Sequence, residues 1–130
     1  MSDTVYQGGC ACGAIRYKSE AEPIFSFHCQ CRQCQQATGT GHASAFIMPA
    51  DRVRITGEIA FFERTASNGH IVAQGFCATC GSPVLNRNSG YPDNVYIHAG
   101  SLDDPSLFKP ERVIFRADAQ PWDMMDPALP

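Results

Sequence analysis

Apolar and polar residues alternate along short segments of this chain, and turn residues separate the segments. Residues 52–56, for example, alternate between arginine or threonine and an aliphatic side chain, and the run stops at Gly57. Alternation with a period of two is typical of strands that bury one face. The same pattern predicts strands over residues 14–18, 24–28, 42–48, 52–56, 59–65, 70–76, 83–87, 94–98 and 112–115.

Only one segment is predicted to be helical. Residues 30–38 have the character of a short helix or a single helical turn, closed by Gly39 and Gly41. Residues 67–69 are suited to a hairpin turn, and residues 121–130 form a Pro-rich tail. Because the strands recur at intervals of roughly 8–12 residues, the pattern favours a mainly β architecture over βαβ units.

Composition indicates a single folded domain over residues 1–130. Hydrophobic residues make up 44% of the chain, enough for a core, and charged residues make up only 18%, which argues against disorder. The formal net charge of −3 argues against binding nucleic acid by electrostatics alone. No stretch approaches the roughly 20 apolar residues of a membrane helix, and residues 1–7 show no signal-peptide pattern. We therefore expect a cytoplasmic protein with neither a nucleic-acid nor a membrane partner.

The seven cysteines fall into three tight groups, and none lies outside a group. An odd number of cysteines without an export signal argues against a disulfide scaffold. In a reducing compartment, clustered cysteines more often bind metal or react than cross-link. The groups are Cys10 with Cys12, then Cys29, Cys31 and Cys34, and finally Cys77 with Cys80.

The two outer pairs are predicted to hold a structural zinc. Cys77 and Cys80 have the spacing of a zinc knuckle, in which a tight turn closed by Gly81 points both sulfurs at one cation. Together with Cys10 and Cys12 they supply four thiolates, which close a tetrahedral shell and leave no position for a substrate. Such a site would tie the N-terminal edge of the sheet to its middle. The alternatives are a redox dithiol at the knuckle or buried free cysteines.

The central group, Cys29, Cys31 and Cys34, is predicted to hold a second, catalytic zinc. Three protein ligands leave the fourth position for water or substrate, as in catalytic zinc sites. A thiolate-rich site also suits a thiol substrate, whose sulfur can complete the tetrahedron. Two alternatives stay open: His28 or His42 supplies a fourth ligand and closes the site, or the three thiols are metal-free and reactive.

The three cysteine motifs, in this order, resemble those of the glutathione-dependent formaldehyde-activating enzyme family, whose domain also occurs in a vertebrate centromere protein. The resemblance implies a β-tent fold of zinc-stapled antiparallel sheets with little helix, a structural zinc on the outer four cysteines and a catalytic zinc on the central three. The family commonly has His between the first two central cysteines, where this chain has Gln30, and the ligands are retained. The matching segments are 8–17, 29–39, 76–82, 99–105 and Pro121-Trp122, so the resemblance spans about residues 8 to 122.

The resemblance further implies a carbon–sulfur lyase that joins glutathione to formaldehyde, giving S-hydroxymethylglutathione. The expected partners are a small thiol such as glutathione and a small aldehyde, and the expected cofactors are two Zn²⁺ ions per chain. Such a thiol carries carboxylates, and Arg32, inside the central group, is the best candidate to bind them. The alternative function is a non-catalytic zinc-binding interaction module on the same fold. A redox enzyme is disfavoured, because no cysteine lies outside the metal groups.

The remaining candidates are weaker. His42, His70 and His98 are possible acid–base groups, although each is more often a strand residue with a satisfied hydrogen bond. The aromatic pair 61–62 and Trp122 are expected to pack in the core. The oligomeric state, the identity of the aldehyde and the direction of the reaction are not predicted.

Overall fold

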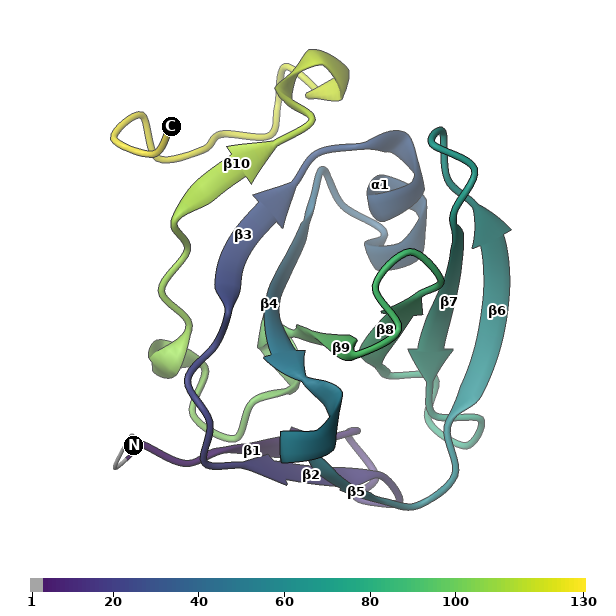
Figure 1. The fold of residues 1–130 in the computed structure, drawn as a ribbon. Helices are drawn as coiled ribbons and strands as arrows, with labels where there is room; N and C mark the ends of the chain where they lie inside the picture. The colour runs from purple at the N-terminus through teal and green to yellow at the C-terminus, as the bar shows by residue number, and fades with distance from the viewer. Residues whose placement is uncertain (1–3) are drawn as a thin grey trace.

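The computed structural model describes residues 4–130, which form two β-sheets and one α-helix (Figure 1). Residues 1–3, the first part of the segment in which no signal peptide is predicted, lie outside the described residues. The smaller sheet has three antiparallel strands in the order β1-β2-β5. These strands are β1 (Tyr6–Gly9), β2 (Arg16–Ser19) and β5 (Arg54–Thr56).

The larger sheet has seven strands in the order β10-β3-β4-β9-β8-β7-β6. In chain order they are β3 (Phe25–Cys29), β4 (Ala43–Pro49), β6 (Ala60–Thr65), β7 (Ile71–Phe76), β8 (Pro83–Asn88), β9 (Asn94–His98) and β10 (Arg112–Ile114). The mainly β prediction is confirmed. The expectation of antiparallel sheets is corrected at one pair, because β10 runs parallel to β3. The connection over residues 99–111 carries the chain from β9 to the β3 edge, so that β10 enters in the direction of β3.

The only α-helix among the described residues, α1 (Arg32–Thr38), lies within the segment predicted to be helical. Cys31 caps its N-terminus, where the Cys31 sulfur accepts a hydrogen bond from the Cys34 backbone N–H. Gly39 ends the helix in the left-handed conformation, with a φ of 77°. The sequence pattern does not predict the short 3₁₀ helices η1 (Ala50–Arg52), η2 (Ala99–Ser101), η3 (Pro105–Leu107) and η4 (Arg116–Asp118).

Within residues 4–130, no helix combines the length and the apolar character that a membrane crossing requires.

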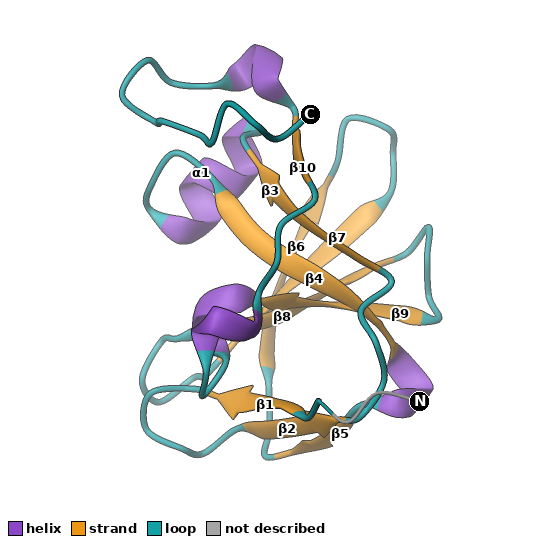
Figure 2. Cartoon of the chain, turned by 90° about the vertical axis from the view of Figure 1, so that its left-hand side faces the viewer, coloured by secondary structure: helices purple, strands orange, loops and turns teal. Residues whose placement is uncertain are grey.

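The main hydrophobic core lies between the two sheets. Tyr6 and Tyr17 of the smaller sheet pack in one cluster with Phe46, Met48 and Ile97 of the larger sheet, and all five are buried. Figure 2 shows the smaller sheet lying across one end of the larger one. Burial of this apolar surface, at about 25 cal/mol per Å², is the main force that holds the two sheets together.

The other face of the larger sheet carries a second, smaller apolar cluster. Its buried members are Phe27, Cys29 and Ala45, on β3 and β4. Side chains alternate between the faces of a strand, so these residues point away from the main core while their neighbours point into it. In Figure 1 the larger sheet curls so that β3 and β4 on one side, and β6 and β7 on the other, flank α1. A cavity opens beside the central cysteines on this face, which we call the hollow face of the larger sheet.

Each of the nine predicted strands overlaps an observed strand, whereas β1 is missing from the prediction. Its sequence, Tyr-Gln-Gly-Gly, contains one apolar side chain and two glycines, which is a weak strand signal. Tertiary contact explains why glycine is needed there. A Cβ on Gly8 would lie 2.1 Å from the Ser101 carbonyl oxygen, in the bridge that joins Gly8 to Leu102.

The expectation that three large aromatic side chains pack in the core is wrong. Phe61, Phe62 and Trp122 are 43%, 60% and 63% exposed. The reason is position: Phe61 and Phe62 lie on β6, which is an edge strand of the larger sheet, and Trp122 lies in the C-terminal segment beyond η4.

Candidate metal centres

The outer four cysteines converge from the turns of two hairpins. Cys10 and Cys12 lie in the connection between β1 and β2, and Cys77 and Cys80 lie between β7 and β8. Their sulfurs all lie within 4.8 Å of one another, with 3.6 Å between Cys10 and Cys12 and 3.7 Å between Cys12 and Cys77. A tetrahedral zinc with Zn–S bonds of about 2.3 Å requires sulfurs about 3.8 Å apart. The group therefore has the right atoms and spacing to hold a metal ion.

Backbone N–H groups point at these sulfurs and stabilise their thiolate form. The N–H of Ile15 donates to Cys10 Sγ at 3.2 Å, and this bond lowers the pKa of Cys10. The N–H of Cys80 donates to Cys77 Sγ at 3.5 Å. Gly81, with a φ of 78°, closes the turn by donating to the Cys77 carbonyl at 2.8 Å. This is the knuckle geometry that the sequence predicts, now with four thiols rather than an isolated redox pair.

The position of the outer four cysteines differs from the prediction. The sequence predicts that they tie the N-terminal edge of one sheet to the middle of the same sheet, and this is wrong because the two pairs lie in different sheets. One pair belongs to the smaller sheet and the other to the larger sheet, so a metal ion there would join the two sheets.

The central three cysteines converge where β3 meets α1. Cys29 ends β3, Cys31 caps the helix, and Cys34 lies in the first turn, where its N–H donates to Cys31 Sγ at 3.3 Å. The three sulfurs lie within 4.8 Å of one another. Hydrogen bonds from the thiols of Cys29 and Cys34 lower the pKa of Cys31 well below its usual range, whereas hydrogen bonding among the three thiols raises the pKa of Cys29 and Cys34. The group thus favours a thiolate, the form of cysteine that binds metal.

Neither histidine considered as a fourth ligand joins this group. His28 lies on the face of β3 opposite Cys29, and its Nδ1 is 2.7 Å from Ser44 Oγ. The Nδ1 of His42 is bonded to the Asp123 carboxylate at 2.9 Å. Among the described residues, the central group therefore consists of three cysteines without a fourth protein ligand.

Gln30, the residue between Cys29 and Cys31, is held from several sides. Its side chain is 2% exposed, and its Nε2 donates to Asp123 Oδ2 at 3.0 Å. Its backbone N–H donates to the Ile114 carbonyl at 3.0 Å, and its carbonyl accepts from Gln35 Nε2 at 2.9 Å. Burial raises the pKa of Asp123, but the hydrogen bonds from Gln30 and His42 outweigh it and lower that pKa. The loop that carries the central cysteines is thereby bonded to the C-terminal segment and to α1.

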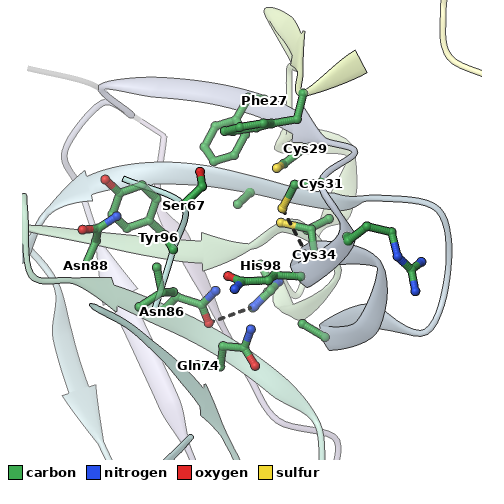
Figure 3. A pocket seen from close by; sticks show the side chains of 18 of the residues that line it. Phe27, Cys29, Cys31, Cys34, Ser67, Gln74, Asn86, Asn88, Tyr96 and His98 are labelled. Atoms are coloured by element: carbon green, nitrogen blue, oxygen red, sulfur yellow. Dashed lines mark hydrogen bonds between the residues drawn. The ribbon is translucent and has the colours of Figure 1, made fainter. Parts of the chain in front are cut away.

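A cavity of about 380 Å³ opens beside the central cysteines, on the hollow face of the larger sheet. Cys29, Cys31 and Cys34 lie at one side of it, and Figure 3 shows their sulfurs beside the ring of Phe27. Ala45 is another apolar lining residue. The volume lies in the range of about 300–1,000 Å³ that is usual for small-molecule sites. The central cysteines therefore border a space in which a substrate can lie.

The opposite wall of the cavity is polar and comes from strands distant in sequence. Gln74 from β7, Asn86 and Asn88 from β8, and Tyr96 and His98 from β9 line it (Figure 3). The three amides and Tyr96 were not predicted from the sequence, because single amides on alternating strands carry no motif. Only the alternation of polar residues within 86–88 and 94–98 could have indicated a solvent-lined or ligand-lined face.

Two of the other predicted site residues, Arg32 and His98, line the cavity, and two, His42 and His70, do not. Arg32 lines the cavity, and its guanidinium donates to Gln35 Oε1. Of the three histidines considered as acid–base groups, His98 lines the cavity, whereas His42 faces Asp123 and His70 packs against Gly90 and Tyr91.

Comparisons with known proteins find a matching family, a related sequence and a similar fold. The sequence model of a family described as "Glutathione-dependent formaldehyde-activating enzyme" matches residues 5–118. A Halomonas elongata protein named "Putative glutathione-dependent formaldehyde-activating enzyme" is 27% identical over 120 residues, covering 88% of this chain and 76% of that protein. The crystal structure of a Rhodobacter sphaeroides protein matches with a TM-score of 0.61 and 19% identity, covering 80% of this chain and 96% of that chain. At this identity the structural match concerns the fold alone.

Proposed function

The chain belongs to the glutathione-dependent formaldehyde-activating enzyme family, and from this premise we propose that it is a zinc-dependent carbon–sulfur lyase. In the proposed reaction a thiol such as glutathione adds to a small aldehyde such as formaldehyde, and the reverse reaction cleaves the same carbon–sulfur bond. The observation that carries the proposal is the central group: three thiols without a fourth protein ligand among the described residues, at the side of a cavity.

The central cysteines fit a catalytic zinc. Their three sulfurs are soft ligands within 4.8 Å of one another, and a bonded N–H and the neighbouring thiols favour the thiolate form of Cys31. When bound, zinc supplies Lewis acidity, which lowers the pKa of a thiol or polarises a carbonyl oxygen. Cys29, Cys31 and Cys34 would hold it, while the cavity walls orient thiol and aldehyde against each other, so that their encounter becomes effectively intramolecular.

Arg32 is proposed to bind a carboxylate of the thiol substrate. Its Nη1 donates to Gln35 Oε1, and Gln35 Nε2 in turn donates to the carbonyls of Gln30 and Asp118 at 2.9 and 3.0 Å. A guanidinium has five N–H groups, so this bond orients Arg32 and leaves donors for a carboxylate. Arg32 is one of the residues that line the cavity, so the proposal assigns its charge to the space that the substrate would fill.

The outer cysteines are proposed to hold a second zinc with a structural role, giving two Zn²⁺ ions per chain. Four sulfurs complete the shell and leave no position for substrate. Residues 1–130 are proposed to form one zinc domain, because the C-terminal segment beyond residue 118 packs back through the Gln30–Asp123 bond and through Val113 N–H to the Pro130 carbonyl at 3.0 Å. Seven thiols in metal groups suit a reducing compartment, so a cytoplasmic location is proposed.

A metal count combined with a rate measurement tests this proposal. The wild-type protein is expected to contain two zinc ions per chain. It is also expected to accelerate the interconversion of ¹³C-formaldehyde plus glutathione and their adduct, and NMR measures the rate of this exchange. Cys31→Ser is expected to lose one zinc and the activity. Asp51→Asn, on exposed η1, is the control and is expected to retain both.

Two outcomes would contradict the proposal. If Cys31→Ser retains both zinc ions, or retains full activity, the central group is not the catalytic site. If the zinc-loaded wild-type protein fails to accelerate any thiol–aldehyde addition while a stable macromolecular partner is recovered with it, the non-catalytic interaction module is the better description.

A further inference from the structure

The cavity beside the central cysteines contains one histidine among its described lining residues, His98. His98 ends β9 and pairs with Ala45 of β4, which places its side chain on the hollow face of the sheet. The residue is 8% exposed, and Figure 3 shows its ring among the cavity side chains, bonded to Asn86. The proposed function gives this buried imidazole no role.

The hydrogen bonds around His98 fix which ring nitrogen carries the proton. The backbone N–H of Gly75 donates to Asn86 Oδ1 at 3.3 Å, which identifies that atom as the amide oxygen. Nε2 of His98 lies 3.3 Å from the same oxygen, so Nε2 must be the donor. In a neutral imidazole, Nδ1 then carries the lone pair and can accept a proton.

This bonding depends on an irregularity in β7. The pairing of β7 with β8 shifts register between Gln74 and Phe76, and there the N–H of Gly75 reaches the Asn86 side chain. A Cβ on Gly75 would lie 2.3 Å from the Leu85 carbonyl oxygen, so the close approach of the two strands requires glycine. The orientation of Asn86, and through it that of His98, is therefore set by the backbone.

The other ionisable groups that line the cavity are poorly suited to move a proton near neutral pH. The three cysteines are the proposed metal ligands, and burial raises the pKa of Tyr96. Arg32 and Arg87 carry guanidinium groups, which donate hydrogen bonds but offer no acceptor atom for a proton. Asp118 lies in exposed η4, and its carbonyl is bonded to Gln35. Histidine is the side chain whose ordinary pKa lies closest to neutrality, and burial lowers the pKa of His98, which keeps the ring neutral.

We propose that His98 is the general base and general acid of the thiol–aldehyde addition, an inference that rests on the proposed function. The thiol S–H bond breaks and its proton moves to His98 Nδ1. The sulfur electron pair forms the bond to the aldehyde carbon, and the π electrons of the carbonyl move to its oxygen. The Nδ1 proton then moves to that oxygen, giving the hemithioacetal. The reverse sequence cleaves the adduct, and no further reactant is needed.

The first test compares His98→Gln with a matched histidine variant. The glutamine amide can still donate to Asn86 but cannot take up a proton, so kcat/KM for glutathione and formaldehyde is expected to fall about 100-fold, the lower end of the range for a lost general base. His70→Gln is the control, because His70 packs outside the cavity against Gly90 and Tyr91, and it is expected to retain wild-type activity. A change of less than about twofold in His98→Gln would overturn the proposal.

The second test does not depend on turnover. Calorimetry in two buffers of different ionisation enthalpy counts the protons released when glutathione alone binds to the zinc-loaded protein. If His98 takes the thiol proton, wild-type protein releases about one proton fewer than His98→Gln. Equal release by both proteins overturns the role of His98, whereas absence of glutathione binding by the wild-type protein contradicts the proposed function itself.

A third measurement covers the case in which His98→Gln does not fold. ¹⁵N NMR of the histidine rings in the wild-type protein is expected to show His98 neutral and protonated on Nε2 at pH 7.5. A ring protonated on Nδ1 would leave no acceptor at that atom and would overturn the proposal.

A fourth measurement uses Asn86→Asp, in which a carboxylate oxygen can still accept the hydrogen bonds from Gly75 and His98. The negative charge favours the protonated imidazole, so the midpoint of the acid limb of the profile of kcat/KM against pH is expected to move up by about one pH unit. An unshifted limb also counts against the proposal.

Discussion

At the scale of single residues, Gly41 shows how closely the C-terminal segment packs against the loop that follows α1. A Cβ on Gly41 would lie 2.3 Å from Cγ and 2.6 Å from Oδ2 of Asp123. This carboxylate accepts hydrogen bonds from Gln30 and His42, so it cannot move aside without breaking them. Gly100, by contrast, has no atom within 4 Å of the position of its Cβ.

Gly41→Ala is therefore expected to lower the free energy of unfolding by about 1–3 kcal/mol, through overpacking against Asp123. Gly100→Ala is the matched control and is expected to be neutral or slightly stabilising, because alanine reduces the entropy of the unfolded chain. Chemical denaturation of both variants measures the difference. Equal effects of the two substitutions would show that Asp123 does not hold its place.

A second residue-scale prediction concerns Arg32. If its guanidinium binds a substrate carboxylate, Arg32→Ala is expected to raise KM for glutathione about tenfold, the loss of one charge-assisted hydrogen bond. KM for 2-mercaptoethanol, which has no carboxylate, is expected to change little. Arg54→Ala, on the exposed face of β5 in the other sheet, serves as the control. An equal rise in KM for both thiols would argue against carboxylate binding.

The buried ring of His98 also predicts a pH dependence of stability. Burial lowers the pKa of His98 in the folded state below its usual value of 6.5. Below pH 6.5 the unfolded chain therefore binds a proton that the native protein does not, so the stability falls as the pH falls. His28, whose pKa is lowered by burial and by His42, contributes in the same direction. Denaturation of zinc-saturated protein at pH 7.5 and 5.5 should show a smaller loss for His98→Gln than for wild type, and equal losses would contradict this account.

At the scale of elements, the C-terminal segment acts on the central cysteine loop. Residues 112–130 include β10, η4 and Asp123, and they bond to Gln30 through both its side chain and its backbone. Gln35 connects α1 to the same segment, because its Nε2 donates to the Asp118 carbonyl and its Oε1 accepts from Gln120. The segment thus supports the loop, and its residues Phe115 and Asp118 also line the cavity.

Removal of the Asp123 carboxylate is expected to loosen that loop. Asp123→Ala leaves a buried donor on Gln30 without its partner, at a cost of about 1–3 kcal/mol. Zinc release from the central site to a chromogenic chelator should become faster, while release from the outer site should not change. Asp51→Ala, an exposed carboxylate on η1, is the control. Release as slow as in this control would show that the segment does not support the site.

At the scale of the whole molecule, two features connect the two sheets. The sheets share one hydrophobic core, and the outer group is a second connection between them, made by a turn from each. A metal ion there adds its binding free energy to the free energy of folding. The central group, by contrast, joins β3 to the helix that directly follows it.

Cys12→Ser is consequently expected to destabilise the whole molecule more than Cys31→Ser does. Cys12 is exposed, so its replacement costs little packing, and the loss of on the order of several kcal/mol would come from the metal. Thermal unfolding of both variants, with zinc content measured in parallel, tests this expectation. If the two variants lose one zinc each and unfold at the same temperature, the difference between a structural and a catalytic site is not supported.

The sequence by itself determined the elements and the candidate ligands. Alternation identified nine of the ten strands found in residues 4–130, because burial of one face imposes a period of two on neighbouring residues. Close spacing identified the central group and each of the two outer pairs, because C-x-C and C-x-x-C turns bring sulfurs together locally, whereas the two outer pairs meet only through the fold. These features depend on residues near one another in the chain, so they can be recognised without the fold.

Only the tertiary structure decided which of these elements contact one another and which of their faces are buried. The parallel entry of β10, the exposure of Phe62 on an edge strand and the bond from Gln30 to Asp123 all join residues distant in sequence. The same holds for the polar cavity wall, in which His98 takes its tautomer from Asn86 and the backbone of β7. Contacts across strands depend on sheet order and register, which local patterns do not specify.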